Sequence, residues 1–565
     1  GGMIHAHILK SGYAFKHTVT DLTNMYMKLG LIRNAAELFD EIPEPNLSIL
    51  NVVVSGFLQN RVVDEGFEVF KFFCMPGLKL DPFTVASVAS SCRIVTSGGQ
   101  VHCLAVKIDL EMDQYVATSL LTMYLNCAEL KSAATLFSAI QDKKMVCYAA
   151  YLSGLVQNGV VKLVLQIFNE MRGLLRENPI PVIVVAVLSA IGSGKLLNLG
   201  MQLHGLILKL ELESDTIVGT SLVDMYSKCG SWRYSYDAFT EMGSSRNLIT
   251  WNSMIVGSMQ NDRVEDAVNL FVELESLQGL KADGTIWNSM ISGFSSLGRA
   301  DEAFLFLRKM MSSGLQPNEQ CLTSLLSSCS SHCLERYGKE VHAYATRMEI
   351  VDDFLATGII DMYMKCGAPS SAHKVFDDFR KRSSDPVLWN AMISGYARNG
   401  RSEDAFVVFE EMIEHRIKPN VTTLNCLLSV CSHTGELEKG FEFFRLLTVV
   451  HGLEPTPKHM NVLIDLLSRA GRLDEAYELL EAVNRNETRA AAAALLGASK
   501  IHSEFGLGEE MARRVVELEP ENPIPFVILS NIYAGQDKWK DVVETRKALD
   551  QKGLKKQPGL SSIVV

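Results

Sequence analysis

The pentapeptide Trp251-Asn252-Ser253-Met254-Ile255 recurs along this chain at a regular spacing. It returns as Trp287-Asn288-Ser289-Met290-Ile291 and as Trp389-Asn390-Ala391-Met392-Ile393, and a weaker copy stands at Leu50-Asn51-Val52-Val53-Val54. The first two copies are 36 residues apart and the third follows after 102, close to three units of 34. A fixed period in the thirties is typical of helix–turn–helix repeats. We therefore expect an all-α solenoid that grows by stacking units rather than by adding globular domains.

Two further motifs recur between the copies of the pentapeptide. A Met-Tyr pair opens a segment that ends in glycine, as at Met225-Tyr226 with Gly230 and at Met362-Tyr363 with Gly367. Glycine suits the left-handed residue that follows a helix, so each of these segments is predicted to be a helix that stops there. The other motif is Gly-x-x-x-His, and its copies are Gly1 to His5, Gly98 to His102, Gly200 to His204 and Gly338 to His342. Equivalent positions of stacked units do not converge on one ion, so we expect structural histidines and no metal.

These motifs divide the chain into units of three types that cycle. The expected units are 16–46, 47–81, 82–113, 114–144, 145–180, 181–215, 216–247, 248–283, 284–318, 319–352, 353–385, 386–420, 421–456 and 457–487. Unit 284–318 follows 248–283 without the His-bearing unit expected between them. Residues 1–15 are interpreted as the tail of a truncated unit, 16–487 as the tandem array, and 488–565 as a C-terminal helical extension.

The bulk composition excludes several classes of protein. The net charge of -11 argues against a protein that coats nucleic acid by charge alone. No apolar run reaches the roughly 18 residues of a membrane span. The twelve cysteines include no Cys-x-x-Cys pair, so neither a zinc ribbon nor a disulfide scaffold is indicated.

With alternating units of about 35, 35 and 31 residues and these motifs, the sequence resembles the plant pentatricopeptide repeat family, and within it the PLS subclass of organelle RNA-editing factors. The stretches Leu496–His502, Leu518–Asn522, Leu529–Tyr533 and Lys556–Gly559 resemble its C-terminal E-type motifs. The resemblance implies a right-handed superhelical solenoid that binds single-stranded organelle RNA in a mitochondrion or chloroplast, the transit peptide lying outside this chain. It also implies that residues 488–565 contact a DYW-type deaminase and editing cofactor proteins.

In this family the fifth and the last residue of a unit read one base together. As last residue, an ionised Asp only accepts hydrogen bonds and suits the ring N–H of uracil or guanine, whereas Asn can donate to adenine or cytosine. The family pattern assigns Asn at the fifth position to pyrimidines and Thr to purines. The pairs that fit are Thr20 with Asn46 (adenine), Asn51 with Asp81 (uracil), Thr220 with Asn247 (adenine), Asn252 with Asp283 (uracil), Asn288 with Asn318 (cytosine), Thr357 with Asp385 (guanine) and Asn390 with Asn420 (cytosine).

Other units depart from this pattern. Asn425 with Thr456 and Asn461 with Glu487 are weakly informative, and Thr118 with Lys144, Ala149 with Ile180 and Val185 with Asp215 leave their bases open. The second residues of units, such as Ile249, Val182 and Val387, would in this family wedge between bases, although ordinary packing between helices explains them equally well.

The function predicted is selection of a cytidine for C-to-U editing by a deaminase acting in trans or by a missing C-terminal domain. His502-Ser503-Glu504 has the His-x-Glu spacing of a zinc deaminase, but no Cys-x-x-Cys follows it. Cys329-Ser330-Ser331-His332-Cys333 offers too few metal ligands at poor helical spacing. We therefore expect no catalysis, cofactor or metal in this chain. The alternatives are an RNA processing or stability factor and a protein-binding scaffold like a tetratricopeptide array.

Overall fold

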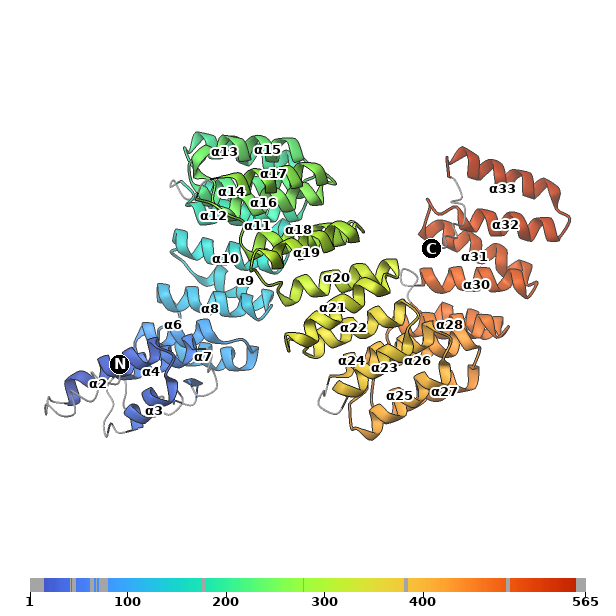
Figure 1. Cartoon of the computed structure of the whole chain (residues 1–565), viewed down its shortest axis with the longest axis horizontal. Helices are drawn as coiled ribbons and strands as arrows, with labels where there is room; N and C mark the ends of the chain where they lie inside the picture. The colour runs from blue at the N-terminus through green and yellow to red at the C-terminus, as the bar shows by residue number, and fades with distance from the viewer. Residues whose placement is uncertain are drawn as a thin grey trace. The chain divides into compact units, whose positions relative to one another are not determined.

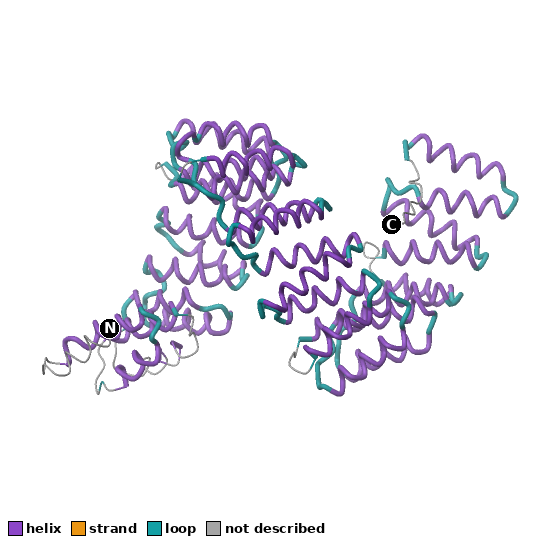
Figure 2. The backbone as a smooth tube through the Cα atoms, viewed as in Figure 1, coloured by secondary structure: helices purple, strands orange, loops and turns teal. Residues whose placement is uncertain are grey.

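The computed structural model describes residues 15–40, 42, 47–60, 66–67, 69–70, 80–174, 178–277, 279–380, 385–483 and 488–554. Within these ranges every regular element is a helix and no strand occurs (Figure 2). The chain forms two compact units, residues 1–286 and 287–565, and each is described by itself. The all-α prediction is thereby confirmed. No helix in the described ranges combines the length and apolarity that crossing a membrane requires.

The helices of the first unit alternate between first and second helices of the repeats. They are α2 (Phe15–Lys28), α3 (Ile32–Asp40), α4 (Leu47–Gln59), α6 (Pro82–Ser91), α7 (Val95–Lys107), α8 (Gln114–Asn126), α9 (Leu130–Ala139), α10 (Met145–Gln157), α11 (Val161–Leu174), α12 (Pro181–Ser193), α13 (Leu197–Lys209), α14 (Thr216–Lys228), α15 (Trp232–Glu241), a 3-10 turn η1 (Gly243–Ser245), α16 (Leu248–Gln260) and α17 (Val264–Ser276).

The second unit continues the alternation. α18 (Gly284–Ser296) includes the boundary, and it is followed by α19 (Ala300–Ser312), α20 (Glu319–His332), α21 (Glu335–Arg347), α22 (Asp353–Lys365), α23 (Pro369–Phe379), α24 (Pro386–Arg398), α25 (Ser402–Glu414), α26 (Val421–Thr434), α27 (Leu437–Arg445), a π-helical turn η2 (Leu446–Val450), α28 (Pro457–Arg469), α29 (Leu473–Ala482), α30 (Arg489–Ile501), α31 (Phe505–Leu518), α32 (Ile524–Gly535) and α33 (Trp539–Gln551).

Local sequence sets where these helices begin and end. From α6 to α28, each first helix begins at the residue after an expected unit edge. Proline opens α6, α12, α24 and α28, where its missing N–H costs nothing. Gly30, Gly230 and Gly367 have φ of 71°, 75° and 74°, so they stop α2, α14 and α22 as the sequence predicted.

First helices pack on first helices and form one layer of each unit. In the first unit α6, α8, α10, α12, α14 and α16 contact one another in that order (Figure 1). In the second unit the same succession runs through α20, α22, α24, α26, α28 and α30. Second helices lie against the first helix of their own repeat, as α9 does on α8 and α25 on α24. Within each unit, corresponding positions on successive first helices therefore line one wall.

The Gly-x-x-x-His and Met-Tyr motifs are two halves of one contact between consecutive repeats. A Cβ on Gly200 would lie 2.5 Å from Met225 Sδ, so only glycine leaves room for that methionine. One turn further along α13, His204 Nδ1 lies 2.9 Å from the Tyr226 hydroxyl of α14. The same contacts join Gly98 with Met123, His102 with Tyr124, Gly338 with Met362 and His342 with Tyr363. The fourth copy, Gly1 to His5, lies outside the described residues.

The tryptophans of the recurring pentapeptide form the core. Trp251 and Trp389 are 2% and 0% exposed. Each meets a phenylalanine of the preceding second helix edge to face, with 4.8 Å between ring centroids: Trp251 with Phe239 and Trp389 with Phe376. The buried tryptophan fixes the rotation of its helix. The asparagine that follows it is therefore held at the edge of the layer of first helices.

Candidate nucleic-acid interface

The last residue of a unit is the N-cap of the next first helix. Asp81 Oδ1 accepts from the Thr84 amide at 2.8 Å and Asn247 Oδ1 from the Thr250 amide at 2.9 Å. Asn318 caps α20 and Asn420 caps α26 in the same way. Asp283 Oδ1 accepts from the Ile286 amide, and Asp385 Oδ1 accepts from the Val387 amide at 2.9 Å. One oxygen of each side chain is thus committed to the start of the following helix.

In two units the fifth and last residues form a direct hydrogen bond although they are 30 residues apart. Asn51 Nδ2 donates to Asp81 Oδ2 at 3.0 Å, and Asn390 Nδ2 donates to Asn420 Oδ1 at 3.2 Å. In unit 216–247 a threonine of the next helix connects the pair. Thr220 Oγ1 lies 2.7 Å from Thr250 Oγ1, which donates to Asn247 Oδ1 at 3.1 Å.

These connecting threonines were missed at the sequence level. Thr84, Thr250 and Thr423 stand three residues after Asp81, Asn247 and Asn420, and they are 1%, 0% and 0% exposed. Each hydroxyl donates to the capping side chain, and Thr84 also donates to Asn51 Oδ1. The signal that could have identified them is Asp or Asn followed by Thr at the third residue, a capping pattern at a unit edge.

Hydrogen bonds at this junction keep Asp81 ionised. Burial acts to raise the pKa of its carboxyl, but the bonds from Thr84 and Asn51 outweigh it and hold the pKa below its ordinary value. The side chain therefore only accepts hydrogen bonds at neutral pH.

The fifth-position asparagines keep hydrogen-bonding capacity that the protein does not use. The Oδ1 atoms of Asn252, Asn288, Asn390 and Asn425 are buried and have no hydrogen-bond partner among the described residues. A buried polar atom without a partner costs about 1–3 kcal/mol, so its repeated occurrence at one register needs a reason.

The remaining predicted residues lie at the expected helical positions. Thr20 and Asn461 are half-buried on α2 and α28, while Asn46 falls outside the described residues. Thr357 is half-buried on α22 and donates to the Asp353 carbonyl at 2.8 Å.

The second residue of a unit points away from the core. Ile249, Val182 and Val387 are 68%, 54% and 51% exposed, so packing between helices does not account for these apolar side chains. The same position carries exposed apolar residues in other units as well. These are Phe83, Tyr115, Val146, Ile217 and Phe354.

In the atypical unit 114–144, the fifth and last positions lie beside a hydrogen bond within the protein. Lys144 Nζ donates to Gln114 Oε1 at 2.9 Å beside the fifth residue, Thr118.

A further pair of fifth and last residues stands in unit 319–352. The fifth residue is Thr323 and the last is Asp352, whose Oδ1 caps α22 by accepting from the Leu355 amide at 2.8 Å. Counting five residues from the expected edge at 319 identifies this pair.

In the described part of the chain, no three His, Cys, Asp or Glu side chains gather closely enough to hold a metal ion. His502, Ser503 and Glu504 form the turn between α30 and α31, with Glu504 as the N-cap residue of α31. Cys329 is buried in α20, whereas Cys333 is exposed at its left-handed C-cap.

An all-helical array with recurrent polar pairs along one wall defines an α-solenoid repeat protein. Models of the PPR repeat match residues 146–174, 249–278, 422–448 and 459–486, and the PPR repeat family model matches 282–331 and 384–433. The E motif model matches residues 502–564. In Arabidopsis thaliana, pentatricopeptide repeat-containing protein At2g02750 is 44% identical over 99% of this chain and 92% of its own length. The chain belongs to the pentatricopeptide repeat family and carries an E motif.

Further relatives and solved structures agree. Two more Arabidopsis thaliana members, At2g03380 (named mitochondrial) and At3g57430 (named chloroplastic), are 29% and 30% identical over 96% and 100% of this chain, and over 88% and 61% of their own lengths. The crystal structure of maize PPR10 matches with a TM-score of 0.51 at 17% identity, covering 94% of this chain and 83% of that one. Its complex with an 18-nt psaJ RNA element matches with a TM-score of 0.50 at 17% identity, covering 95% and 84%. At this identity the likeness shows the fold.

Proposed function

We propose that this protein binds single-stranded RNA in a sequence-specific manner, one base per unit. The observation that carries the proposal is the approach of fifth and last residues across a unit, as in Asn51 with Asp81 and Asn390 with Asn420. Helical repeats can read one base each through two or three side chains on successive units. The maize PPR10 structure with RNA gives an instance of this fold holding such a ligand.

The capping geometry supplies a physical basis for the choice of base. Because the cap uses Oδ1, an asparagine at the last position is left with its Nδ2 donor, which suits the bare ring nitrogen of adenine or cytosine. An aspartate in the same place is left with a second acceptor oxygen, which suits the ring N–H of uracil or guanine. The cap thus selects which polar atom faces the base.

Applied to residues 216–420, these pairs specify a target. Thr220 with Asn247, Asn252 with Asp283 and Asn288 with Asn318 select adenine, uracil and cytosine. Thr357 with Asp385 and Asn390 with Asn420 select guanine and cytosine, and the overlooked pair Thr323 with Asp352 selects guanine between the two groups. The exposed Ile249, Val182 and Val387 would separate neighbouring bases, since apolar side chains can cover base faces that water would otherwise meet.

The finer role we propose is specification of a cytidine for C-to-U editing of an organelle transcript. The alternation of unit types resembles that of the PLS subclass, and a match to the E motif at residues 502–564 follows the array. The deaminase would act in trans or belong to a C-terminal domain outside this chain, because these 565 residues contain no zinc-binding Cys-x-x-Cys of the kind that such chemistry needs. Trp539 and Val543, one turn apart on α33, are 62% and 51% exposed and offer an apolar contact for a protein partner. Relatives named mitochondrial and chloroplastic support a location in one of the two organelles.

Filter binding tests the proposal directly. An RNA carrying adenine-uracil-cytosine-guanine-guanine-cytosine is compared with a scrambled RNA of the same composition, at one salt concentration because phosphate contacts depend on salt. The proposal requires tighter binding of the first RNA; equal affinities refute base reading and favour the protein-binding scaffold. A preference for the first RNA without any effect of the protein on editing in its organelle would favour an RNA processing or stability factor.

A further inference from the structure

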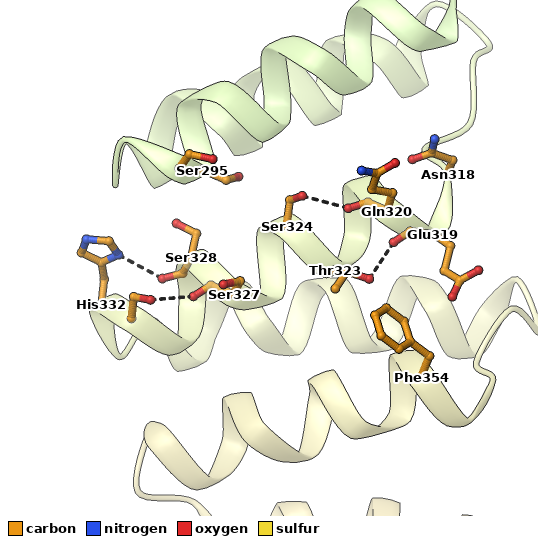
Figure 3. A pocket seen from close by; sticks show the side chains of 12 residues that line it. Ser295, Asn318, Glu319, Gln320, Thr323, Ser324, Ser327, Ser328, His332 and Phe354 are labelled. Atoms are coloured by element: carbon orange, nitrogen blue, oxygen red, sulfur yellow. Dashed lines mark hydrogen bonds between the residues drawn. The ribbon is translucent and has the colours of Figure 1, made fainter. Parts of the chain in front are cut away.

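A groove of about 900 Å³ runs along α20 in the second unit (Figure 3). Ser295 and Ser296, at the end of α18, form one side of it. α20 forms the opposite side with Ser324, Ser327, Ser328, Ser331 and the terminal His332, among others. This volume lies within the roughly 300–1,000 Å³ of sites that enclose small molecules.

Two of these hydroxyls have no use within the protein. Ser295 and Ser328 are 6% and 4% exposed, and neither Oγ atom has a hydrogen-bond partner among the described residues. His332 has an assigned partner, since its Nδ1 lies 3.0 Å from the Ser328 carbonyl oxygen. Buried hydroxyls of this kind destabilise a fold unless something hydrogen-bonds to them.

In two other pairs of consecutive units, the residues at these positions are apolar. Ser295 is the twelfth residue of its unit and Ser328 the tenth residue of the His-bearing unit that follows. At the same two positions the chain has Val156 with Ala190, and Ala397 with Val430. Leu58 with Ser91 is the remaining such pair, and Ser91 Oγ donates to the Ser87 carbonyl at 3.0 Å. The two serines without hydrogen-bond partners therefore stand at the point in the chain where unit 284–318 interrupts the cycle of unit types.

The open rim of the groove is made of base-reading positions. Asn318 is the last residue of one unit, Thr323 the fifth of the next, and Phe354 the second of the one after. Phe354 is 63% exposed, and an aromatic ring in that state can stack on a base. The groove therefore opens where the nucleotides read by units 284–318 and 319–352 would lie.

The chemistry of the lining favours a nucleoside over a phosphate. Among the described residues that line the groove there is no Lys or Arg, and the one carboxylate is that of Glu319. Hydroxyls both donate and accept, so they can satisfy the edge of any base or the hydroxyls of a ribose.

We propose that this groove accepts one extra nucleotide of the bound RNA, looped out between the bases read by units 284–318 and 319–352. The inference rests on the proposed RNA binding. The protein would then tolerate an inserted nucleotide at this point of its target. At other points an insertion moves all following bases out of register with their units.

The test compares three RNAs by filter binding. The first is the coded RNA; the second has one uridine inserted between the positions for 284–318 and 319–352; the third has it between the positions for 353–385 and 386–420. We expect the second RNA to bind within roughly threefold of the first and the third to lose roughly tenfold or more, because its bases leave register. A second RNA as weak as the third overturns the inference alone. A coded RNA no better than its scrambled counterpart overturns the proposed function and the inference with it.

A double variant, Ser295→Val with Ser328→Ala, fills the groove with the residues found at Val156 and Ala190. It should bind the coded RNA unchanged but lose the tolerance of the second RNA by roughly tenfold. Its melting temperature should not fall, since it removes two unpartnered hydroxyls. The matched control is Ser193→Ala on α12, which removes an exposed hydroxyl far along the sequence and should leave all three affinities as they were. Unaltered tolerance in the double variant refutes the role of this groove.

Discussion

In the proposed binding mode, a single side chain at each unit edge caps a helix through one atom and contacts a base through another. Asp385 caps α24 through its Oδ1, as Asn420 caps α26, and in the proposed binding mode the same side chains contact a base. Asp and Asn are about equally good N-caps, so exchanging them alters the outward-facing atom with little cost to the helix. This explains how a repeat protein can vary its target without disturbing its fold.

The substitution Asp385→Asn should therefore switch a base preference. It replaces an acceptor by a donor opposite the base read with Thr357, so the preference should move from guanine toward adenine by roughly 1–3 kcal/mol, on the scale of protein–DNA base contacts. Affinities of wild type and variant for two RNAs that differ at that base measure the effect.

Asp215→Asn provides the control for this experiment. Asp215 Oδ1 accepts from the Ile217 amide at 2.8 Å, the same geometry as Asp385 with Val387, but the fifth residue of its unit is Val185, which forms no hydrogen bonds through its side chain. This variant should change neither base preference nor stability appreciably. If Asp385→Asn instead weakens both RNAs equally, Asp385 serves only as a cap.

The sequence predicted the positions of these residues better than their connections. Asp81, Asn247 and Asn420 could be identified because an N-cap residue before an apolar segment marks a helix start. The link from Thr220 through Thr250 to Asn247 could not, because it depends on the distance between two helices of successive units. Whether Ile249 is packed between helices or exposed also could not be predicted from the sequence, because isoleucine occurs in both environments.

At the scale of one helix, α16 places a core residue and a surface residue within three positions of each other. Trp251 is 2% exposed and Ile249 is 68% exposed. Residues two apart in an α-helix lie about 200° apart around its axis, so the core does not depend on the side chain that the RNA would meet.

Alanine substitutions at these two positions should have opposite effects. Trp251→Ala removes a buried aromatic side chain and should lower the free energy of unfolding by about 3–5 kcal/mol. Ile249→Ala should leave stability within about 0.5 kcal/mol but weaken RNA binding, because less apolar surface is covered by bases. Denaturant melts and filter binding measure the two quantities, and a large loss of stability in Ile249→Ala would mean that this side chain belongs to the core.

The histidines that join second helices to the next first helix make stability depend on pH. Burial lowers the pKa of His204 and His342, although Glu241 and Asp378 act in the opposite direction. The unfolded chain, with histidine pKa values near about 6.5, therefore binds more protons than the folded chain. Stability contributed by neutral histidine is present above that pH and is lost as the pH falls toward the lower folded values.

The double variant His204→Gln with His342→Gln should have a flatter stability profile below about pH 6.5. Glutamine can still bond Tyr226 and Tyr363 but does not titrate. Melting temperatures between pH 5 and 8 measure the slope, with His433→Gln, a substitution of an exposed histidine, as the control. A slope equal to that of the wild type would assign the acid sensitivity to other groups.

Helix positions could be predicted from the repeat, but the spaces between helices could not. The edges at 82, 114, 181 and 386 coincide with helix starts because capping residues and prolines are local signals. The groove beside Ser295 and Ser328 arises from how α18 and α20 approach each other, which no local pattern records. Sequence did indicate the place indirectly, through the missing His-bearing unit before 284–318.

At the scale of the whole molecule, the net charge of -11 does not favour binding to the phosphate backbone by charge alone. Contacts to individual bases are therefore the main source of selectivity among RNAs. An array of units that each read one base predicts a linear correspondence between protein and RNA. Neither a protein-binding scaffold nor a merely electrostatic contact predicts that correspondence.

A substitution scan of the RNA tests this central claim most directly. Each of the six bases assigned to residues 216–420 is changed in turn, and the affinity of the intact chain is measured at one salt concentration. We expect each change at a paired unit to cost roughly 1–3 kcal/mol, at adjacent nucleotides and in the order of the units, with the assigned base preferred each time. Uniform affinities across the scan, or sensitive positions that do not follow the order of the units, would contradict the account.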